Sequence, residues 1–135
     1  MKPTRIAQAT CAALIASGAI ACMAQDYPSR PIQMIISFAP GGGFDQTSRN
    51  TAQALAEVLK QPVAPINIDG ASGSIGLTRL ANAVPDGYTI GITPAVSLTS
   101  EPHRNKGVTY SMDSFRYVCQ VFDNIFSIAV QKDSP

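Results

Sequence analysis

The sequence contains no tryptophan and a single histidine, and only 14% of its 135 residues are charged. Ten Lys and Arg residues against nine Asp and Glu residues give a net charge of +1. The clustered basic surface that neutralises phosphates is therefore missing, and we expect no nucleic-acid partner. A hydrophobic share of 45% excludes a disordered, highly charged tail. The length fits one ordinary domain or part of a larger one.

The first residues follow the pattern of an export signal. Lys2 and Arg5 precede an apolar, alanine-rich run that extends to Ala21, and small residues lead up to a cleavage position after Ala24. We interpret residues 1–24 as a secretory signal peptide and expect a periplasmic protein. A membrane anchor is the alternative, but the uninterrupted apolar stretches are shorter than the roughly 20 residues that a membrane span needs.

Cysteine is scarce, and most of it precedes the predicted cleavage. Removal of the signal peptide takes away Cys11 and Cys22, so Cys119 has no partner for an intramolecular disulfide. We expect Cys119 to be a small buried hydrophobe. Acylation at Cys22 is an alternative to simple cleavage, although the residue three positions before it is Ala rather than the usual Leu.

The mature chain opens with a short apolar run at residues 32–38 that is rich in strand-forming residues. Such a run suits a strand covered on both faces, as in a parallel sheet. A glycine-rich loop at residues 40–43 follows, and then a helix with apolar residues at helical spacing. The stripe is formed by Ala52, Leu55, Ala56 and Leu59, and the side chains expected to cap the helix are Asp45, Thr47 or Ser48.

The same order of elements then repeats. A second strand is predicted at residues 63–68, and Pro65 either weakens this strand or places it at an edge of the sheet. A second glycine-rich loop at 70–74 leads to another helix, and a turn at 85–87 leads to a strand at 88–93. The alternation predicts an α/β fold with right-handed crossovers. The second helical stripe is Leu77, Leu80, Ala81 and Val84, and two further strands are predicted at 117–121 and 126–130.

Both glycine-rich loops lie between a strand and a helix, where loops of parallel sheets converge on a ligand crevice. The N–H groups of Gly41, Gly42 and Gly43 can approach a ligand closely, and the following helix adds positive partial charge. The pair of loops predicts a pocket for an anion, a carboxylate or a phosphate. Tight turns without a ligand remain the alternative. Neither loop matches a nucleotide-binding motif, so no nucleotide cofactor is expected.

Catalytic and metal-binding patterns are not found. His103 lies in a polar stretch and is interpreted as a solvated loop residue, and one His with one mature Cys cannot form a zinc site. We therefore predict no catalytic residues, no metal and no cofactor, and a protein that is not an enzyme. Two alternatives stay open: an exported α/β enzyme that uses the loops as an oxyanion or phosphate site, and a truncated product without independent function.

Four segments in fixed order carry a family resemblance: Tyr-Pro-Ser-Arg-Pro-Ile at 27–32, Phe-Ala-Pro-Gly-Gly-Gly-Phe-Asp at 38–45, Gly-Ala-Ser-Gly-Ser-Ile-Gly at 70–76 and Pro-Asp-Gly-Tyr-Thr at 85–89. Together they resemble the Bug (TctC-like) family of periplasmic solute receptors. The resemblance implies a two-domain, Venus-flytrap periplasmic-binding fold of type II and a small carboxylate ligand. It further implies the membrane permease subunits of a tripartite tricarboxylate transporter as partners, and a monomeric receptor.

The resemblance also implies which residues form one wall of the ligand cleft, with Phe44 favouring a less polar acid. Family members are about twice this length or more. We therefore interpret residues 25–114 as the first α/β domain and residues 115–135 as crossover strands toward a second domain that is largely missing. The expected ligand-binding residues are Pro40, Gly41, Gly42, Gly43, Phe44, Asp45, Ser72, Gly73, Ser74 and Thr93.

Overall fold

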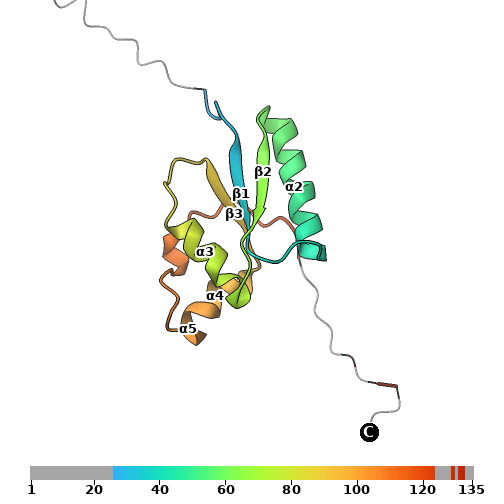
Figure 1. Ribbon diagram of the computed structural model, residues 1–135, viewed down its shortest axis with the longest axis vertical. Helices are drawn as coiled ribbons and strands as arrows, with labels where there is room; N and C mark the ends of the chain where they lie inside the picture. The colour runs from blue at the N-terminus through green and yellow to red at the C-terminus, as the bar shows by residue number, and fades with distance from the viewer. Residues whose placement is uncertain (1–25, 124–128, 130, 133–135) are drawn as a thin grey trace, which may run out of the picture.

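The computed structural model of the chain describes residues 26–123, 129 and 131–132 (Figure 1). The predicted signal peptide and four of the five residues of the predicted strand at 126–130 lie outside these ranges. In chain order the elements are β1 (Ile32–Ile36), α2 (Gly43–Leu59), β2 (Val63–Asn67), η1 (Ala71–Gly73), α3 (Ser74–Ala81), β3 (Thr89–Ile92), α4 (Ala95–Thr99), α5 (Glu101–Arg104) and η2 (Met112–Ser114).

The three strands form one parallel sheet in the order β2-β1-β3, which confirms the α/β prediction. In its register Ile35 of β1 lies opposite Ile66 of β2 and Gly91 of β3. Pro65 lies in β2 at an edge of this sheet, as predicted, where a residue without an N–H is tolerated. Because β2 and β3 lie on opposite sides of β1, right-handed crossovers place α2 and α3 on opposite faces.

The α2 face of the sheet carries the main hydrophobic core. Alternate residues of β1, namely Ile32, Met34 and Ile36, are buried and cluster with Ala52 of α2. The predicted apolar stripe of α2 is thus confirmed, since its remaining members are partly buried against the same cluster. Burial of each such side chain contributes about 1.5–3 kcal/mol, which makes this face the main source of stability. The remaining stripe members are Leu55, Ala56 and Leu59.

Helix α3 approaches the opposite face closely because two glycines leave room for it. A Cβ placed on Gly76 would lie 2.7 Å from the carbonyl oxygen of Ile68, and one placed on Gly91 would collide with the Leu80 side chain. The helix ends at Ala81, so the prediction that Val84 belongs to its buried stripe is wrong. Val84 follows the helix with 70% of its surface exposed, because the turn at 85–87 redirects the chain.

The prediction of a side-chain cap on α2 is also wrong. The helix begins at Gly43 with Gly42 as its N-cap, earlier than expected, and no side chain caps it. Thr47 and Ser48 therefore lie inside the helix, where their hydroxyl groups donate to carbonyl oxygens four residues earlier. Asp45 lies in the first turn, where its negative charge favours the helix N-terminus.

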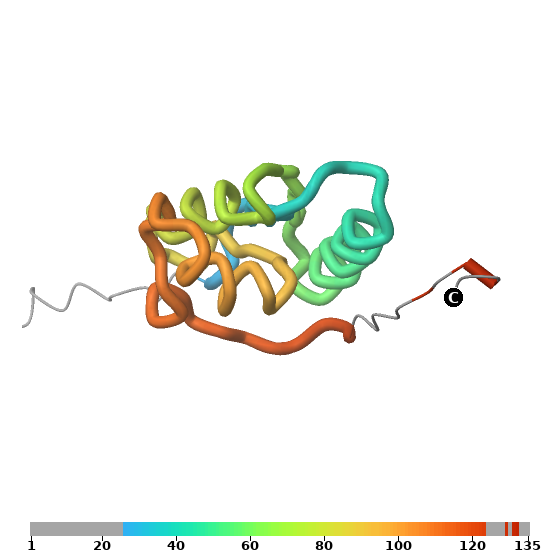
Figure 2. Tube along the Cα trace, turned by 90° about the horizontal axis from the view of Figure 1, so that it is seen from below, coloured from blue at the N-terminus to red at the C-terminus, as the bar shows by residue number. Residues whose placement is uncertain are grey.

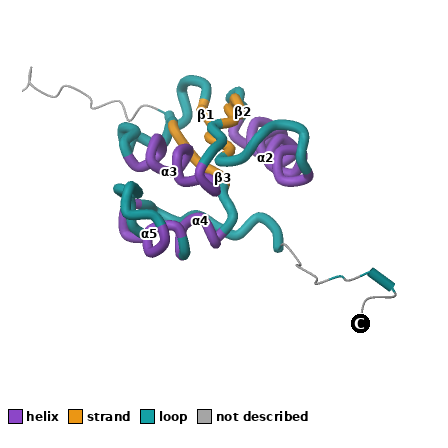
Figure 3. The backbone as a smooth tube through the Cα atoms, turned by 60° about the horizontal axis from the view of Figure 1, so that its bottom comes forward, coloured by secondary structure: helices purple, strands orange, loops and turns teal. Residues whose placement is uncertain are grey.

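Two short helices follow β3 where the sequence indicated no element, and Figure 3 shows α4 and α5 next to each other. His103 is exposed, as expected, but it belongs to α5 rather than to a loop. The predicted strand at 117–121 is not formed, because a strand requires a hydrogen-bonded neighbour and this segment has none among the described residues. Cys119 in this segment is exposed, so the prediction that it is buried is wrong.

The segment after η2 crosses from the α5 side of the molecule to the α2 side (Figure 2). It is extended, and its Phe122 side chain packs against the core on the α2 face. Val118, earlier in the same segment, is 92% exposed. Within the described residues, no helix combines the length and the apolar composition needed to cross a membrane.

Candidate functional site

The candidate site lies at the edge of the sheet where the parallel strands end. Ser37 directly follows β1, Asn67 ends β2 and Thr93 directly follows β3. The Ser37 hydroxyl is buried and donates a hydrogen bond of 2.8 Å to the Thr93 hydroxyl. The predicted site residue Thr93 is thereby fixed beside the point where the chain leaves β1 for the first glycine-rich loop. This is the edge at which ligands bind in open α/β sheets.

The second glycine-rich loop packs directly against this edge. Gly73 has a φ of +89°, and a Cβ there would lie 3.0 Å from the Ser97 hydroxyl oxygen and 3.1 Å from the Phe38 ring. Only glycine fits both the left-handed backbone and the narrow space. Ser37 is therefore the residue around which the predicted residues Gly73 and Thr93 and the base of the first loop lie.

Buried hydroxyl groups hold the second loop in an unusual backbone conformation. Ala71 and Ser72 both have positive φ, 47° and 54°, which is rare for residues that carry a Cβ. The fully buried Ser97 hydroxyl donates to the carbonyl oxygen of Ser72 at 2.6 Å, and the Tyr110 hydroxyl in turn donates to the carbonyl oxygen of Ser97 at 2.6 Å. Ser72 itself is exposed, so its hydroxyl faces solvent at the candidate site.

The first glycine-rich loop presents exposed backbone. Pro40, Gly41, Gly42 and Gly43 are all exposed. A Cβ on any of the three glycines would meet nothing within 4 Å. Because the first N–H groups of a helix have no acceptor within the helix, the start of α2 offers backbone donors beside this open space.

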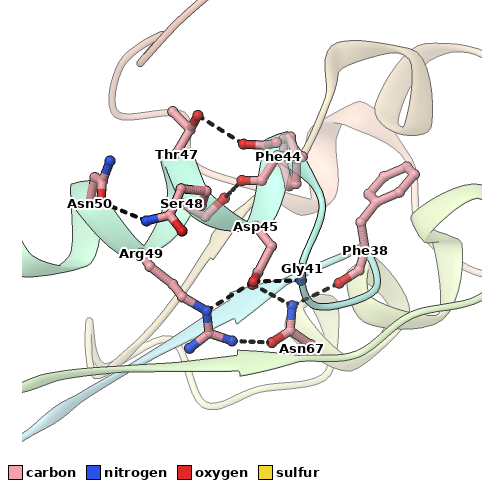
Figure 4. A network of polar contacts seen from close by, with 11 residues as sticks. Phe38, Gly41, Phe44, Asp45, Thr47, Ser48, Arg49, Asn50 and Asn67 are labelled. Atoms are coloured by element: carbon pink, nitrogen blue, oxygen red, sulfur yellow. Dashed lines mark hydrogen bonds and ion pairs between the residues drawn. The ribbon is translucent and has the colours of Figure 1, made fainter.

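One polar network joins the first loop to the sheet and to α2 (Figure 4). Asp45 accepts hydrogen bonds from the Gly41 amide at 2.9 Å, from Arg49 Nε at 3.0 Å and from Asn67 Nδ2 at 2.8 Å. Arg49 also donates from Nη2 to the Asn67 side-chain oxygen at 2.6 Å. Asn67 Nδ2 additionally donates to the carbonyl oxygen of Phe38 at 2.9 Å. The network thus connects the ends of β1 and β2 with the loop between β1 and α2.

This network stabilises the charged form of Asp45. The hydrogen bond from Arg49, followed by those from Gly41 and Asn67, lowers the pKa of Asp45 from 3.8 to about 2. Asp45 is therefore a carboxylate at any pH near neutrality, and its charge is compensated by the Arg49 guanidinium. The start of α2 is consequently close to electrically neutral apart from its helix dipole.

Phe44 belongs to an aromatic cluster at the border of the first loop. Its ring centroid lies 5.4 Å from that of Phe38 and 5.6 Å from that of Phe122, with inclined planes in both pairs. Such tilted and edge-on contacts are favourable geometries for aromatic pairs. The cluster attaches the extended segment after η2 to the region where the first loop enters α2.

Two hollows of the surface border the sheet, one beside this edge and one near the opposite end of the strands. One hollow of about 250 Å³ is bordered by Ser74 and Ile75 at the start of α3 and by Val108. A second, of about 540 Å³, lies by Arg30 and Tyr88 near the opposite end of the strands. The candidate site is thus an open wall in this chain. The described residues contain no group of His, Cys, Asp and Glu side chains suited to a metal ion.

Four residues that shape this wall were not predicted from the sequence, namely Ser37, Arg49, Asn67 and Ser97. The i, i+4 spacing of Asp45 and Arg49 was a usable signal for their ion pair. Asn67 carried a weaker signal, as a polar residue at the end of a strand. Ser37 and Ser97 carried none, because nothing local distinguishes a buried serine from an exposed one.

Comparison with known proteins places the chain in a family. Residues 47–135 match the model of the tripartite tricarboxylate transporter family receptor, TctC. A UPF0065 protein of Bordetella pertussis is 32% identical over 121 residues, which are 90% of this chain and 38% of that protein. The chain therefore spans about two fifths of the length of this relative.

Solved structures give the same assignment at a similar coverage. A structure described as a periplasmic transporter has 40% identity and a TM-score of 0.60 over 63% of this chain and 29% of its own. MatC of Rhodopseudomonas palustris with bound malate has 30% identity and a TM-score of 0.60, over 64% of this chain and 30% of its own.

A second R. palustris protein, solved with adipate, has 32% identity and a TM-score of 0.52, over 56% of this chain and 26% of its own. The bound molecules of these two relatives are both carboxylates. The matched family model describes transporter receptors, not enzymes, and one solved relative is described as a periplasmic transporter. The chain belongs to the TctC family of tripartite tricarboxylate transporter receptors.

Proposed function

We propose that this chain forms one wall of the binding cleft of an extracytoplasmic receptor for a small carboxylate. The observation that carries the proposal is the convergence of two glycine-rich loops and a strand-end hydroxyl at one edge of a parallel sheet. Membership of the TctC family, with relatives that bind malate and adipate, supports a carboxylate over other anions.

The wall recognises the carboxylate through backbone N–H groups and short hydroxyl side chains. Amides at the start of α2 point into open space, and the α2 dipole favours a negative charge there. Phe44 gives the wall an apolar border, which favours an acid with an apolar chain. The residues assigned to the wall are Pro40, Gly41, Gly42, Gly43, Phe44, Ser72, Gly73, Ser74 and Thr93.

The rest of the cleft belongs to a second domain. We assign residues 25–114 to the first domain and residues 115–135 to the connection toward the second. Two-domain receptors exclude water by closing on the ligand, so a single wall binds weakly. In this proposal residues 1–24 direct a monomeric receptor to the periplasm, where the closed form docks on the membrane permease subunits of the transporter.

Replacement of Gly42 by valine tests the wall directly. Gly42 has an ordinary negative φ and free space around it, so the valine fits the fold and occupies the place proposed for the ligand. We expect malate or adipate at millimolar concentration to shift the NMR signals of the Gly41–Gly43 amides. The shifts should be absent in Gly42→Val and unchanged in Ala54→Val, an exposed control in α2.

If malate or adipate shifts the amide signals equally in Gly42→Val and in the original chain, the assignment of the loop is refuted. Shifts in neither protein, at concentrations that saturate a complete TctC receptor, would show that this wall alone does not bind.

A further inference from the structure

The Asp45 network has a role that differs from ligand contact. We propose that Asp45 is a positioning residue: together with Arg49 and Asn67 it holds the first glycine-rich loop in the shape that presents amides to the ligand, and does not itself touch the ligand. The inference rests on the proposed function, because it names what sets the geometry of the same wall.

Among the described residues, the three glycines of the loop have open space at their Cβ positions. Three successive glycines lose more conformational freedom on ordering than any other residues. No glycine in the loop has a neighbour within 4 Å of its Cβ position. Gly41 also has a φ of +89°. The hydrogen bond from the Gly41 amide to Asp45 is therefore the side-chain contact that fixes this loop relative to α2, beside the backbone hydrogen bond from Gln46 to Gly42.

The Asp45 carboxylate is already engaged by three donors. The side chain is 7% exposed, and both of its oxygens accept hydrogen bonds. Its three donors come from the loop, from α2 and from β2, so the carboxylate joins three parts of the fold. A bare carboxylate at this place would repel an anionic ligand, and the ion pair with Arg49 removes that penalty.

Arg49 is the cation nearest in sequence to the first glycine-rich loop. Its Nε and Nη2 groups donate to Asp45 and Asn67, so the guanidinium is aimed at the network. Asn67 extends the network to the base of the loop by donating a hydrogen bond to the carbonyl oxygen of Phe38. At the first loop, recognition of the ligand is thereby left to backbone amides held at a fixed spacing.

Amide hydrogen exchange of the full chain tests the proposal without any ligand. In Asp45→Asn, one oxygen replaces two and cannot serve all three donors. We expect the Gly41 amide to exchange about tenfold faster, the equivalent of one lost hydrogen bond. The amides of Ile35 and Ile36 in β1 should be unchanged. Arg49→Gln should give a smaller change of the same kind. Gln46→Ala, which removes only an exposed pair with Asn50, serves as the control.

A second arm compares two ligands that differ by an ammonium group, succinate and aspartate. If Asp45 positions the loop, Asp45→Asn weakens both acids by the same factor. Unequal losses would mean direct contact and would overturn the proposal, as would unchanged exchange at Gly41. If neither acid binds the original chain, the wall alone does not bind these acids, but the exchange result still decides whether Asp45 fixes the loop.

Discussion

The close approach of α3 to the sheet gives the sharpest prediction for stability. Gly76 lies in the first turn of α3, and an added Cβ would stand 2.7 Å from the carbonyl oxygen of Ile68 and 3.1 Å from Cα of Ser37. Packed carbon atoms normally keep about 3.5–4.0 Å. Both neighbours are backbone atoms that cannot rotate away. In Gly76→Ala the whole helix must therefore move outward.

Two opposing contributions decide whether Gly76→Ala raises or lowers the free energy of unfolding. Replacing glycine by alanine inside a helix gains up to about 1 kcal/mol of propensity. Forcing extra volume into a packed contact costs about 1–3 kcal/mol. We expect the packing cost to exceed the gain in helix propensity, because backbone atoms block the added methyl group on two sides. The free energy of unfolding should fall by about 1 kcal/mol, which for a chain of this size lowers Tm by roughly 4 °C.

The assay is urea and thermal unfolding followed by circular dichroism, with Gly43→Ala as the matched control. Gly43 begins α2 and has nothing within 4 Å of its Cβ position. The same substitution there keeps the propensity gain without the collision, so this variant should be as stable as the original or slightly more. The reasoning would be refuted if Gly76→Ala matched Gly43→Ala in stability.

Two further predictions concern the second loop and the Asp45 network. Ser97→Ala removes the donor to the Ser72 carbonyl oxygen at a fully buried position. In urea melts this change should lower the free energy of unfolding by about 1–3 kcal/mol. Thr99→Ala, on the exposed side of α4, is the control and should have little effect. Because the pKa of Asp45 is lowered to about 2, its contribution to stability is present above pH 3.8 and is lost as the pH falls toward 2. Stability should therefore decline more steeply over this range in the original chain than in Asp45→Asn; parallel declines would contradict the network.

Local pattern predicted the framework of the fold well. The helical spacing of Ala52 and Leu55 and the apolar run of β1 report on burial along one element, which the chain encodes within a few residues. Prediction failed where the signal is not periodic. Helices α4 and α5 are too short to show a stripe, and the 117–121 segment has strand-like composition but no partner strand.

The sequence by itself determined the alternation of strands and helices, the edge position of β2 and the placement of glycine-rich loops before two helices. It also carried the family signature. Only the tertiary structure decided which side chains meet at the candidate site. Asp45 and Asn67 are 22 residues apart, and Ser97 is 25 residues from Ser72. Hydrogen bonds of this kind form only after the sheet and helices have packed, because packing sets the distance and angle between donor and acceptor. The geometry of the wall is therefore a property of the assembled fold.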